Sequence, residues 1–375
     1  MRAAVLTLAF GLILAALPAV AEDKPADGSK PLFNGKDLTG WTNVNCAPGT
    51  FFAKDGEIIT TGVPTGFLRF EKQFENFELE MDWMHVEKVK MANSGLFVWG
   101  DPLPGVGTPY TRGIEVQVLI NYKPADGWAT SHGDIFSIHG ARCTPDRPHP
   151  KGYERCLPSE DRVKGGGEWN HYKVIANDGA IKLHVNGKEV SGVSKCSPRK
   201  GYLALESEGV ECHFKNLKVK ELPSTNPKPE EVAKVWEGHT SLFTGVNLDG
   251  WKTEKDSWKA DGGVLKVAGK ADLASEKKFG PCELVFDCKI PAASKAEWSV
   301  QFGMNHSVTL TNPDIDFRGK WNRVVVTVGK DGVSQTLNGR QGPKSGSVPD
   351  LGPIVFKPAD GLEIMNVFVR ELKEK

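Results

Sequence analysis

The chain contains two versions of one sequence pattern, and this internal repeat constrains its fold more than any other feature. Residues 31–41 return as residues 241–251, and residues 167–187 return as residues 319–339. Two further matches in the same order relate residues 53–59 to 260–265 and residues 201–222 to 352–372. The period is far longer than a solenoid unit, so each copy is expected to be a whole domain. We predict domains at 30–222 and 240–373, joined by a stiff, polar linker over 223–239 in which residues 230–237 form a short helix.

The local patterns favour strands over helices. Residues 77–83 alternate apolar and acidic side chains, which is typical of an antiparallel strand with one buried face. Asn177-Asp178-Gly179 separates two such segments and predicts a hairpin. The 375 residues include 41 Gly and 24 Pro, a composition rich in turns, and no long segment has helical periodicity. The expected fold is therefore all-β, with two antiparallel β-sandwiches in tandem.

The amino terminus has the features of an export signal. Arg2 precedes an apolar stretch too short to span a bilayer, and Ala19-Val20-Ala21 provides a small-x-small cleavage site. We therefore expect residues 1–21 to be a signal peptide, the mature protein to be periplasmic or extracellular, and no later segment to cross a membrane. Lys+Arg and Asp+Glu both number 47, so no net charge favours nucleic acid as a partner.

Export also implies an oxidising compartment in which disulfides persist. The chain has seven cysteines, an odd number, so at least one thiol remains unpaired or pairs between chains. We predict that Cys156 bonds to Cys143 or to Cys196, since all three belong to the first domain.

A very apolar strand over residues 114–120 provides the first candidate for chemistry. Glu115 and Gln117 share one face of this strand, while the alternate residues are aliphatic. The plain alternative is a solvated outer face, as expected for Glu78 and Glu80. Two observations favour a catalytic or ligand-contacting role for Glu115: the apolar composition of a central strand, and the long insertion that follows. Arg112, which precedes the strand, is a further candidate sugar contact.

The first copy has an insertion of roughly 45 residues that the second copy lacks, far longer than an ordinary connection. We consider four polar side chains of this insertion as sugar contacts, together with Arg155 as a further cationic donor: Asp134, His139, Arg147 and Glu160. His132 and Asp134 could also form a metal site with His139 or His149. Their spacing fits no established metal signature, so we expect neither a metal nor a cofactor. A third reading is a loop whose polar groups cap its own backbone.

Two further segments of the first copy offer candidate site residues. In Ser94–Gly100, we expect Phe97 and Trp99 to share a face, which would allow Trp99 to stack on a sugar ring; an ordinary core tryptophan is the alternative. Glu206 and Glu208 are two residues apart and face the same way if they lie on a strand. Like charges held close raise one pKa, which suits an acid–base pair; the alternative is a solvated turn before Gly209.

Five segments together resemble the 3-keto-disaccharide hydrolase domain family: LFNGKDLTGW, NSGLFVWG, GIEVQVL, GEWNHYKV and the closing strand that ends in Lys-Glu-Leu. The resemblance covers about residues 30–222, whereas residues 240–373 match only in the framework. It implies a concanavalin-like β-sandwich whose concave face acts on glycosides oxidised to a ketone at C3. Glu115 and Gln117 match the family's Glu-x-Gln strand, which implies that Glu115 is the base.

The sequence departs from this family at two places. Trp99 stands where many members have arginine, and Leu205–Gly209 replaces a Leu-Gln-Asp-His-Gly run, so Glu206 or Glu208 is the candidate for the missing group. We therefore predict an exported carbohydrate-active protein whose first domain hydrolyses 3-keto-glycosides or related glycosides, with Glu115 and Glu208 as catalytic residues. A non-catalytic glycan-binding protein and a structural protein of the cell envelope are the alternatives.

The second copy is expected to be non-catalytic. Its strand corresponding to residues 114–120 is His306–Leu310, which has no carboxylate, and it lacks the insertion.

Overall fold

The structure is a computed structural model of the chain. It describes residues 27–88, 91–121, 132–233, 236, 238–294, 298–303, 306–309, 318–346 and 352–372. The expected signal peptide at 1–21 lies outside these residues. Within the described ranges there is no helix long and apolar enough to cross a membrane.

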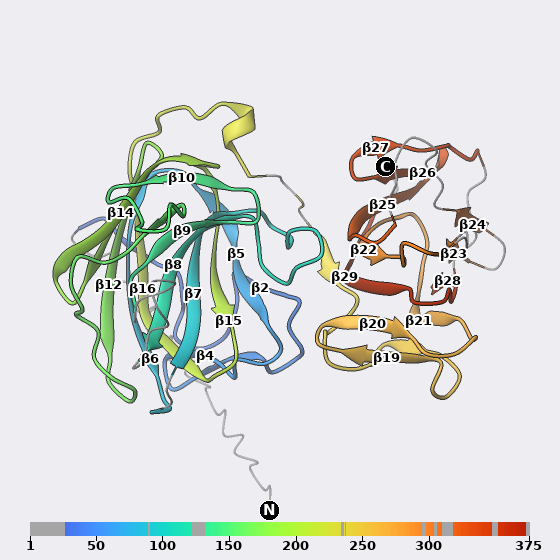
Figure 1. Cartoon of the computed structure of the whole chain (residues 1–375), viewed down its shortest axis with the longest axis horizontal. Coiled ribbons are helices and arrows are strands. Elements are labelled where there is room, and N and C mark those ends of the chain that lie inside the picture. Colours follow the sequence, from blue (N-terminus) through green and yellow to red (C-terminus); the bar gives the residue numbers. More distant parts are fainter. Residues whose placement is uncertain are drawn as a thin grey trace, which may run out of the picture.

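The described residues form four antiparallel sheets, two in each half, and the halves lie side by side (Figure 1). In the first half, nine strands form one sheet, and β1 (Lys30–Pro31) pairs with β16 outside the main path. The path runs through β10 (Arg142–Pro145), β14 (Lys188–Ser197), β13 (Ala180–Val185), β12 (Asn170–Asn177), β6 (Phe77–His85), β16 (Cys212–Glu221), β4 (Glu57–Thr60) and β3 (Phe51–Lys54). The seven-stranded sheet that packs against it runs through β11 (Arg155–Cys156), β9 (Ile135–Ile138), β8 (Gly113–Asn121), β7 (Met91–Gly100), β15 (Gly201–Ser207), β5 (Gly66–Phe74) and β2 (Trp41–Val44).

The second half has an eight-stranded and a five-stranded sheet. The larger runs through β19 (Trp258–Asp261), β20 (Val264–Val267), β29 (Glu363–Glu371), β22 (Cys282–Lys289), β25 (Asn322–Gly329), β26 (Gly332–Leu337) and β27 (Arg340–Gln341), with β17 (Thr240–Ser241) paired to β29. The smaller runs through β18 (Trp251–Lys252), β21 (Leu273–Phe279), β28 (Gly352–Phe356), β23 (Ser299–Phe302) and β24 (His306–Thr309). Its strand order matches β2-β5-β15-β7-β8, and the described residues of the second half contain no counterpart of β9, β10 and β11, which come from the insertion.

Alternation of side chains sets the two faces of each sheet, as β6 shows. Residues 77, 79, 81, 83 and 85 are buried between the sheets, while Glu78, Glu80 and Asp82 lie on the outer face. The hairpin between β12 and β13 turns at Asp178 and Gly179, both with positive φ, as a two-residue Asp-Gly turn requires. The all-β expectation is confirmed.

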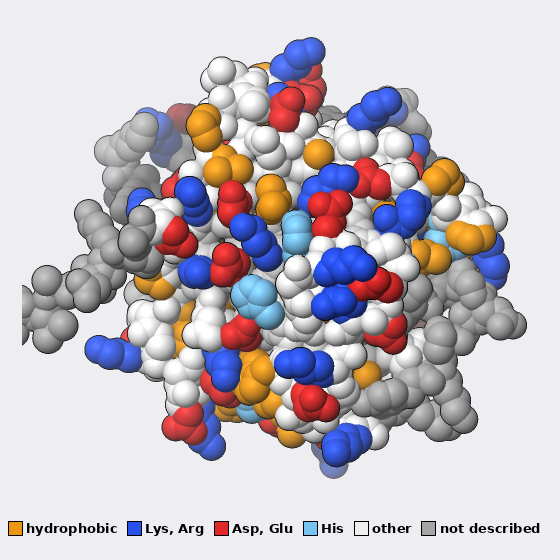
Figure 2. All heavy atoms as spheres, turned by 90° about the vertical axis from the view of Figure 1, so that its left-hand side faces the viewer, with side chains coloured by type: hydrophobic (Ala, Val, Ile, Leu, Met, Phe, Trp, Pro, Cys, Tyr) orange, Lys and Arg blue, Asp and Glu red, His pale blue; other side chains and the backbone are white. Residues whose placement is uncertain are grey.

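The outer face of the nine-stranded sheet is charged. Lys173 pairs with Glu78 at 2.9 Å, and Lys218 pairs with Glu80 at 2.9 Å across neighbouring strands. The side of the protein turned away from the second half shows positive and negative side chains interspersed, with only small apolar areas between them (Figure 2). A solvated outer face is therefore the correct interpretation for Glu78 and Glu80.

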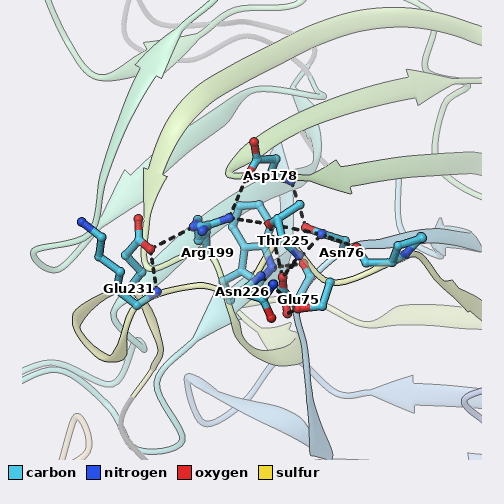
Figure 3. A network of polar contacts seen from close by, with 11 residues as sticks. Glu75, Asn76, Asp178, Arg199, Thr225, Asn226 and Glu231 are labelled. Atoms are coloured by element: carbon cyan, nitrogen blue, oxygen red, sulfur yellow. Dashed lines mark hydrogen bonds and ion pairs between the residues drawn. The ribbon is translucent and has the colours of Figure 1, made fainter.

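The connecting segment is held on the first half by hydrogen bonds and ion pairs (Figure 3). The Thr225 amide donates to Glu75 at 2.6 Å, and Arg199 bonds to Asp178 at 2.7 Å and to Glu231 at 3.2 Å. Among the described residues of this segment, the helix is one 3-10 turn, η1 (Pro229–Glu231), and it ends before Val232, whose backbone is extended with φ −102 and ψ 135. The expected helix over 230–237 is therefore interrupted at Val232.

All seven cysteines are free thiols, and all are buried. The predicted bond from Cys156 to Cys143 or Cys196 is therefore not formed. The three residues nevertheless lie in one region, since β10 with Cys143 pairs with β14, which includes Cys196, and the Cys156 thiol accepts from Gly192 on β14 at 3.5 Å.

Candidate functional site

Three glutamates lie together on the outer face of the seven-stranded sheet. Glu115 on β8 is the cross-strand partner of Phe97, and Glu206 on β15 is the partner of Phe67; both glutamates point away from the core between the sheets. Gly95 on β7 lies between them. A Cβ atom at Gly95 would lie 2.9 Å from Glu115 Oε1 and 3.0 Å from Glu206 Oε2, so the missing side chain gives the two carboxyl groups their room.

Burial and nearby carboxylates raise the pKa of both Glu115 and Glu206. Glu115 is 6 % exposed, and burial, with the nearby Glu208 charge, raises its pKa to about 8. Glu206 is 1 % exposed, and burial together with Glu115 and Glu208 raises its pKa well above the usual range. The Oε2 atom of Glu206 is buried and has no hydrogen-bond partner among the described residues. Such an atom is costly to bury and marks a place for a ligand or a proton.

Glu208 is held as a hydrogen-bond acceptor at the edge of this group. The Tyr110 hydroxyl donates to Glu208 Oε1 at 2.7 Å, and the Asn93 amide donates to Glu208 Oε2. The Tyr110 ring stacks on His139, with ring centroids 5.6 Å apart and an interplanar angle of 10°. Burial and the Glu208 charge raise the pKa of Tyr110 and keep its hydroxyl a donor.

A polar chain continues from Asn93 along the sheet. Gln117 Nε2 donates to Asn93 Oδ1 at 2.7 Å, and Arg155 Nη2 donates to Gln117 Oε1 at 3.1 Å. Arg155 Nε also bonds to the fully buried Asp134 at 2.6 Å, so this carboxylate has the paired cation that burial demands. The Arg155 charge acts against the rise in the Glu115 pKa, which ties the chain electrostatically to the carboxyl group.

Seven of the predicted site residues lie in or beside this group: Glu115, Gln117, Asp134, His139, Arg155, Glu206 and Glu208. Arg112 forms a two-pronged ion pair with Asp101 at 2.7 and 2.9 Å. Its role as a sugar contact remains a prediction.

Three of the predicted sugar contacts lie apart from this group, and for Trp99 the structure supports the alternative of an ordinary core tryptophan. Trp99 is 0 % exposed and packs in the core, with its Nε1 donating to Glu75 O at 2.8 Å. Its φ of 55° interrupts the alternation, so Val98 and Trp99 both face the core while Phe97 faces outward.

Arg147 and Glu160 both have partners outside the carboxylate group. Arg147 is exposed and donates to the carbonyls of Leu157 and Val190. Glu160 pairs with Arg162 at 2.9 Å and with Lys188 at 2.7 Å. Neither has a contact with the carboxylate group.

The described residues contain no set of three or more His, Cys, Asp or Glu arranged for an ion, and the side chains of the metal alternative have other partners. His132 receives the Arg162 amide at 3.1 Å and pairs with Asp161 at 3.0 Å, whereas Asp134 pairs with Arg155.

Sequence reasoning missed Asn93 and Tyr110. Asn93 precedes the Ser94–Gly100 segment by one residue and could have been assigned by alternation, because Asn93, Gly95 and Phe97 share a face. Tyr110 lies in the loop between β7 and β8, where no period relates a side chain to a face.

The sequence model of the family described as 3-keto-alpha-glucoside-1,2-lyase-like domain matches residues 28–220, and the chain belongs to this family. A curated relative from Bacteroides thetaiotaomicron, named 3-keto-disaccharide hydrolase, is 27 % identical over an alignment of 183 residues, and the match covers 44 % of this chain and 58 % of the relative. The chain thus spans less than two thirds of that relative's length.

Two of the solved structures with similarity to the chain are described by their relation to sugars. A putative glycosyl hydrolase from Parabacteroides distasonis is 24 % identical with a TM-score of 0.40, over 54 % of this chain and 98 % of that one. The VIP36 exoplasmic/lumenal domain in its Ca²⁺/mannose-bound form is 8 % identical with a TM-score of 0.37, over 51 % of this chain and 87 % of that one.

Proposed function

We propose that the first half is an enzyme that cleaves 3-keto-glycosides, with Glu115 as the base. A ketone at C3 acidifies the C2 hydrogen. Glu115 removes this proton, the electron pair forms an enolate at C2–C3–O, and collapse of the enolate expels the C1 substituent with its bonding electrons. The departing oxygen takes up a proton, and water then adds across C1 and C2 to complete the hydrolysis.

The observation that supports this proposal most strongly is the pair of buried carboxyl groups above Gly95. A base works best when its pKa lies near the operating pH, and the pKa of Glu115 is about 8. Glu206, whose pKa is raised further, stays protonated and can donate to the C3 oxygen as the enolate develops. Because Glu115 is only 6 % exposed, the substrate displaces some of the side chains that now cover it.

The test is release of sugar from a 3-keto-glucoside by the full-length protein and by Glu115→Gln. We expect turnover by the native protein and a loss of about 10² to 10⁴-fold in the variant. We also expect kcat/KM to rise with pH and level off above about pH 8, since the base is free only when deprotonated. Glu78→Gln, which changes a strand glutamate on the opposite sheet paired to Lys173, is the matched control and should keep full activity.

The alternative of glycan binding without turnover has a distinct outcome. Saturable binding of the 3-keto-glucoside with no product, unchanged by long incubation, would replace the enzyme proposal with a binding module. Export, and the absence of catalysis in the second half, remain parts of the proposal; the latter is supported by β24 and β28, which have no glutamate or aspartate among their residues.

A further inference from the structure

The second half packs on the same sheet face that holds the carboxyl groups. Val285 on β22 and Phe368 on β29 form one apolar cluster with residues of the first half: Val44, Phe67, Phe97, Leu103 and Ala204. Phe97 and Phe67 are the cross-strand partners of Glu115 and Glu206. The second half therefore covers the residue on the strand next to each of these two glutamates.

A comparison of corresponding positions in the two halves shows that the second half has apolar side chains where it makes this contact. In the first half, Glu80 on β6 pairs across strands with Lys173 and Lys218, and this row faces solvent. In the second half the row at the same register is Val285, with Val325 and Phe368 on its two sides. A charged row has become an apolar row where the first half covers it, as burial requires.

A polar pair beside each row differs in the same way. Asn216 Nδ2 donates to Asp82 Oδ2 at 2.6 Å on the exposed face of the first half. Asn366 Nδ2 donates to Asp287 Oδ2 at 2.6 Å, but both side chains are buried under the loop between β7 and β8. Both asparagines have positive φ, 53° and 54°.

The buried pair holds the loop that carries Tyr110. Asn366 Nδ2 lies 2.9 Å from the Thr108 carbonyl and 3.2 Å from the Gly105 carbonyl, and the Gly107 amide donates to Asp287 at 3.0 Å. Arg323 donates to the Pro104 carbonyl at 2.8 Å while it neutralises Asp287. Tyr110 itself packs against the shared apolar cluster. The loop is thus bonded at four successive places before it presents the Tyr110 hydroxyl to Glu208.

We propose that the second half is a fixed wall of the site, in which Asn366 and Asp287 are positioning residues that hold Tyr110 against Glu208. The kinetic part of this inference rests on the proposed function; the structural part does not. The connecting segment bonded to Glu75 and Arg199 supports a permanently docked wall rather than a swinging one.

The experiment is a double-mutant cycle with Tyr110→Phe and Asn366→Gly in the full-length protein. Glycine accepts the positive φ, and Arg323 still neutralises Asp287, so the variant should fold, which thermal unfolding checks. We expect each single change to lower kcat/KM for a 3-keto-glucoside about tenfold or more, and the double change to be scarcely worse than either one. Asn216→Gly, the same change at the corresponding exposed position, should leave kcat/KM unchanged.

Amide hydrogen exchange of residues 101–111 gives a readout that needs no turnover. Faster exchange in Asn366→Gly, with no change in Asn216→Gly, supports the inference. Native kcat/KM in Asn366→Gly, losses that multiply in the double variant, or unchanged exchange would each overturn it. If the native protein turns over no substrate, only the proposed function is refuted. The exchange measurement then tests, without any activity, whether the second half holds the loop that carries Tyr110.

Discussion

The buried Glu115 carboxyl makes the stability of the protein depend on pH in a predictable direction. Its pKa rises from the usual 4.5 to about 8 on folding because of burial and the nearby Glu208. The folded state therefore binds this proton more tightly than the unfolded state does. The associated stability is fully present below about pH 4.5 and is lost as the pH rises through about 8.

The change that isolates this effect is Glu115→Gln, which keeps the size of the side chain and removes the charge. A rise in pKa from 4.5 to about 8 corresponds to a ceiling of about 5 kcal/mol. The buried Glu206 remains in the variant, so we expect less than this ceiling. The unfolding free energy of the variant, relative to that of the native protein, should rise by about 2 to 4 kcal/mol between pH 5 and pH 8.

The assay is urea unfolding of both proteins at several pH values, followed by intrinsic tryptophan fluorescence. The difference in unfolding free energy should be small at pH 5 and grow steadily toward pH 8. Glu78→Gln, on the exposed face, should show a difference that does not vary with pH. A constant difference for Glu115→Gln, or one that shrinks with rising pH, would refute the assignment of a raised pKa to this carboxyl group.

Three further changes test the arrangement around the site. Gly95→Ala places a methyl group within 3.0 Å of two carboxyl oxygens, so we expect activity to fall at least tenfold with little change in Tm, because the flexible carboxyl ends move aside. Arg155→Met leaves the buried Asp134 without its cation and should cost about 3 to 5 kcal/mol in urea unfolding. Trp99→Phe should lower stability by about 1 to 3 kcal/mol and leave sugar affinity measured by calorimetry unchanged, since this side chain is in the core.

The sequence predicted the features that depend on strand period. Alternation alone placed Glu78 and Glu80 on an outer face and put Glu115 and Gln117 together on one side of a strand. The same reasoning failed at Trp99, because a single residue with positive φ reverses the faces after it, and no residue type there announces such a bulge.

The sequence also contained a sign that the second half covers another surface, but this sign is visible only when the strands of the two copies are aligned residue by residue. Alignment of the two copies places Val285 at the position of Glu80 and Phe368 at that of Lys218. An exposed strand face that turns apolar in one copy indicates a partner surface, although it does not say which surface. The Tyr110 hydrogen bond was beyond prediction, because it depends on a loop that contacts between the halves hold in place.

The shared apolar cluster has a practical consequence for dividing this protein. A fragment that ends after β16 would leave Phe67 and Phe97 uncovered beside the glutamates, and the complementary fragment would present Val285 and Phe368 to water. Each piece would then tend to self-associate through the surface that its former neighbour protected. Weak activity of the amino-terminal fragment alone would therefore reflect the loss of its contact with the second half as much as the loss of any catalytic group.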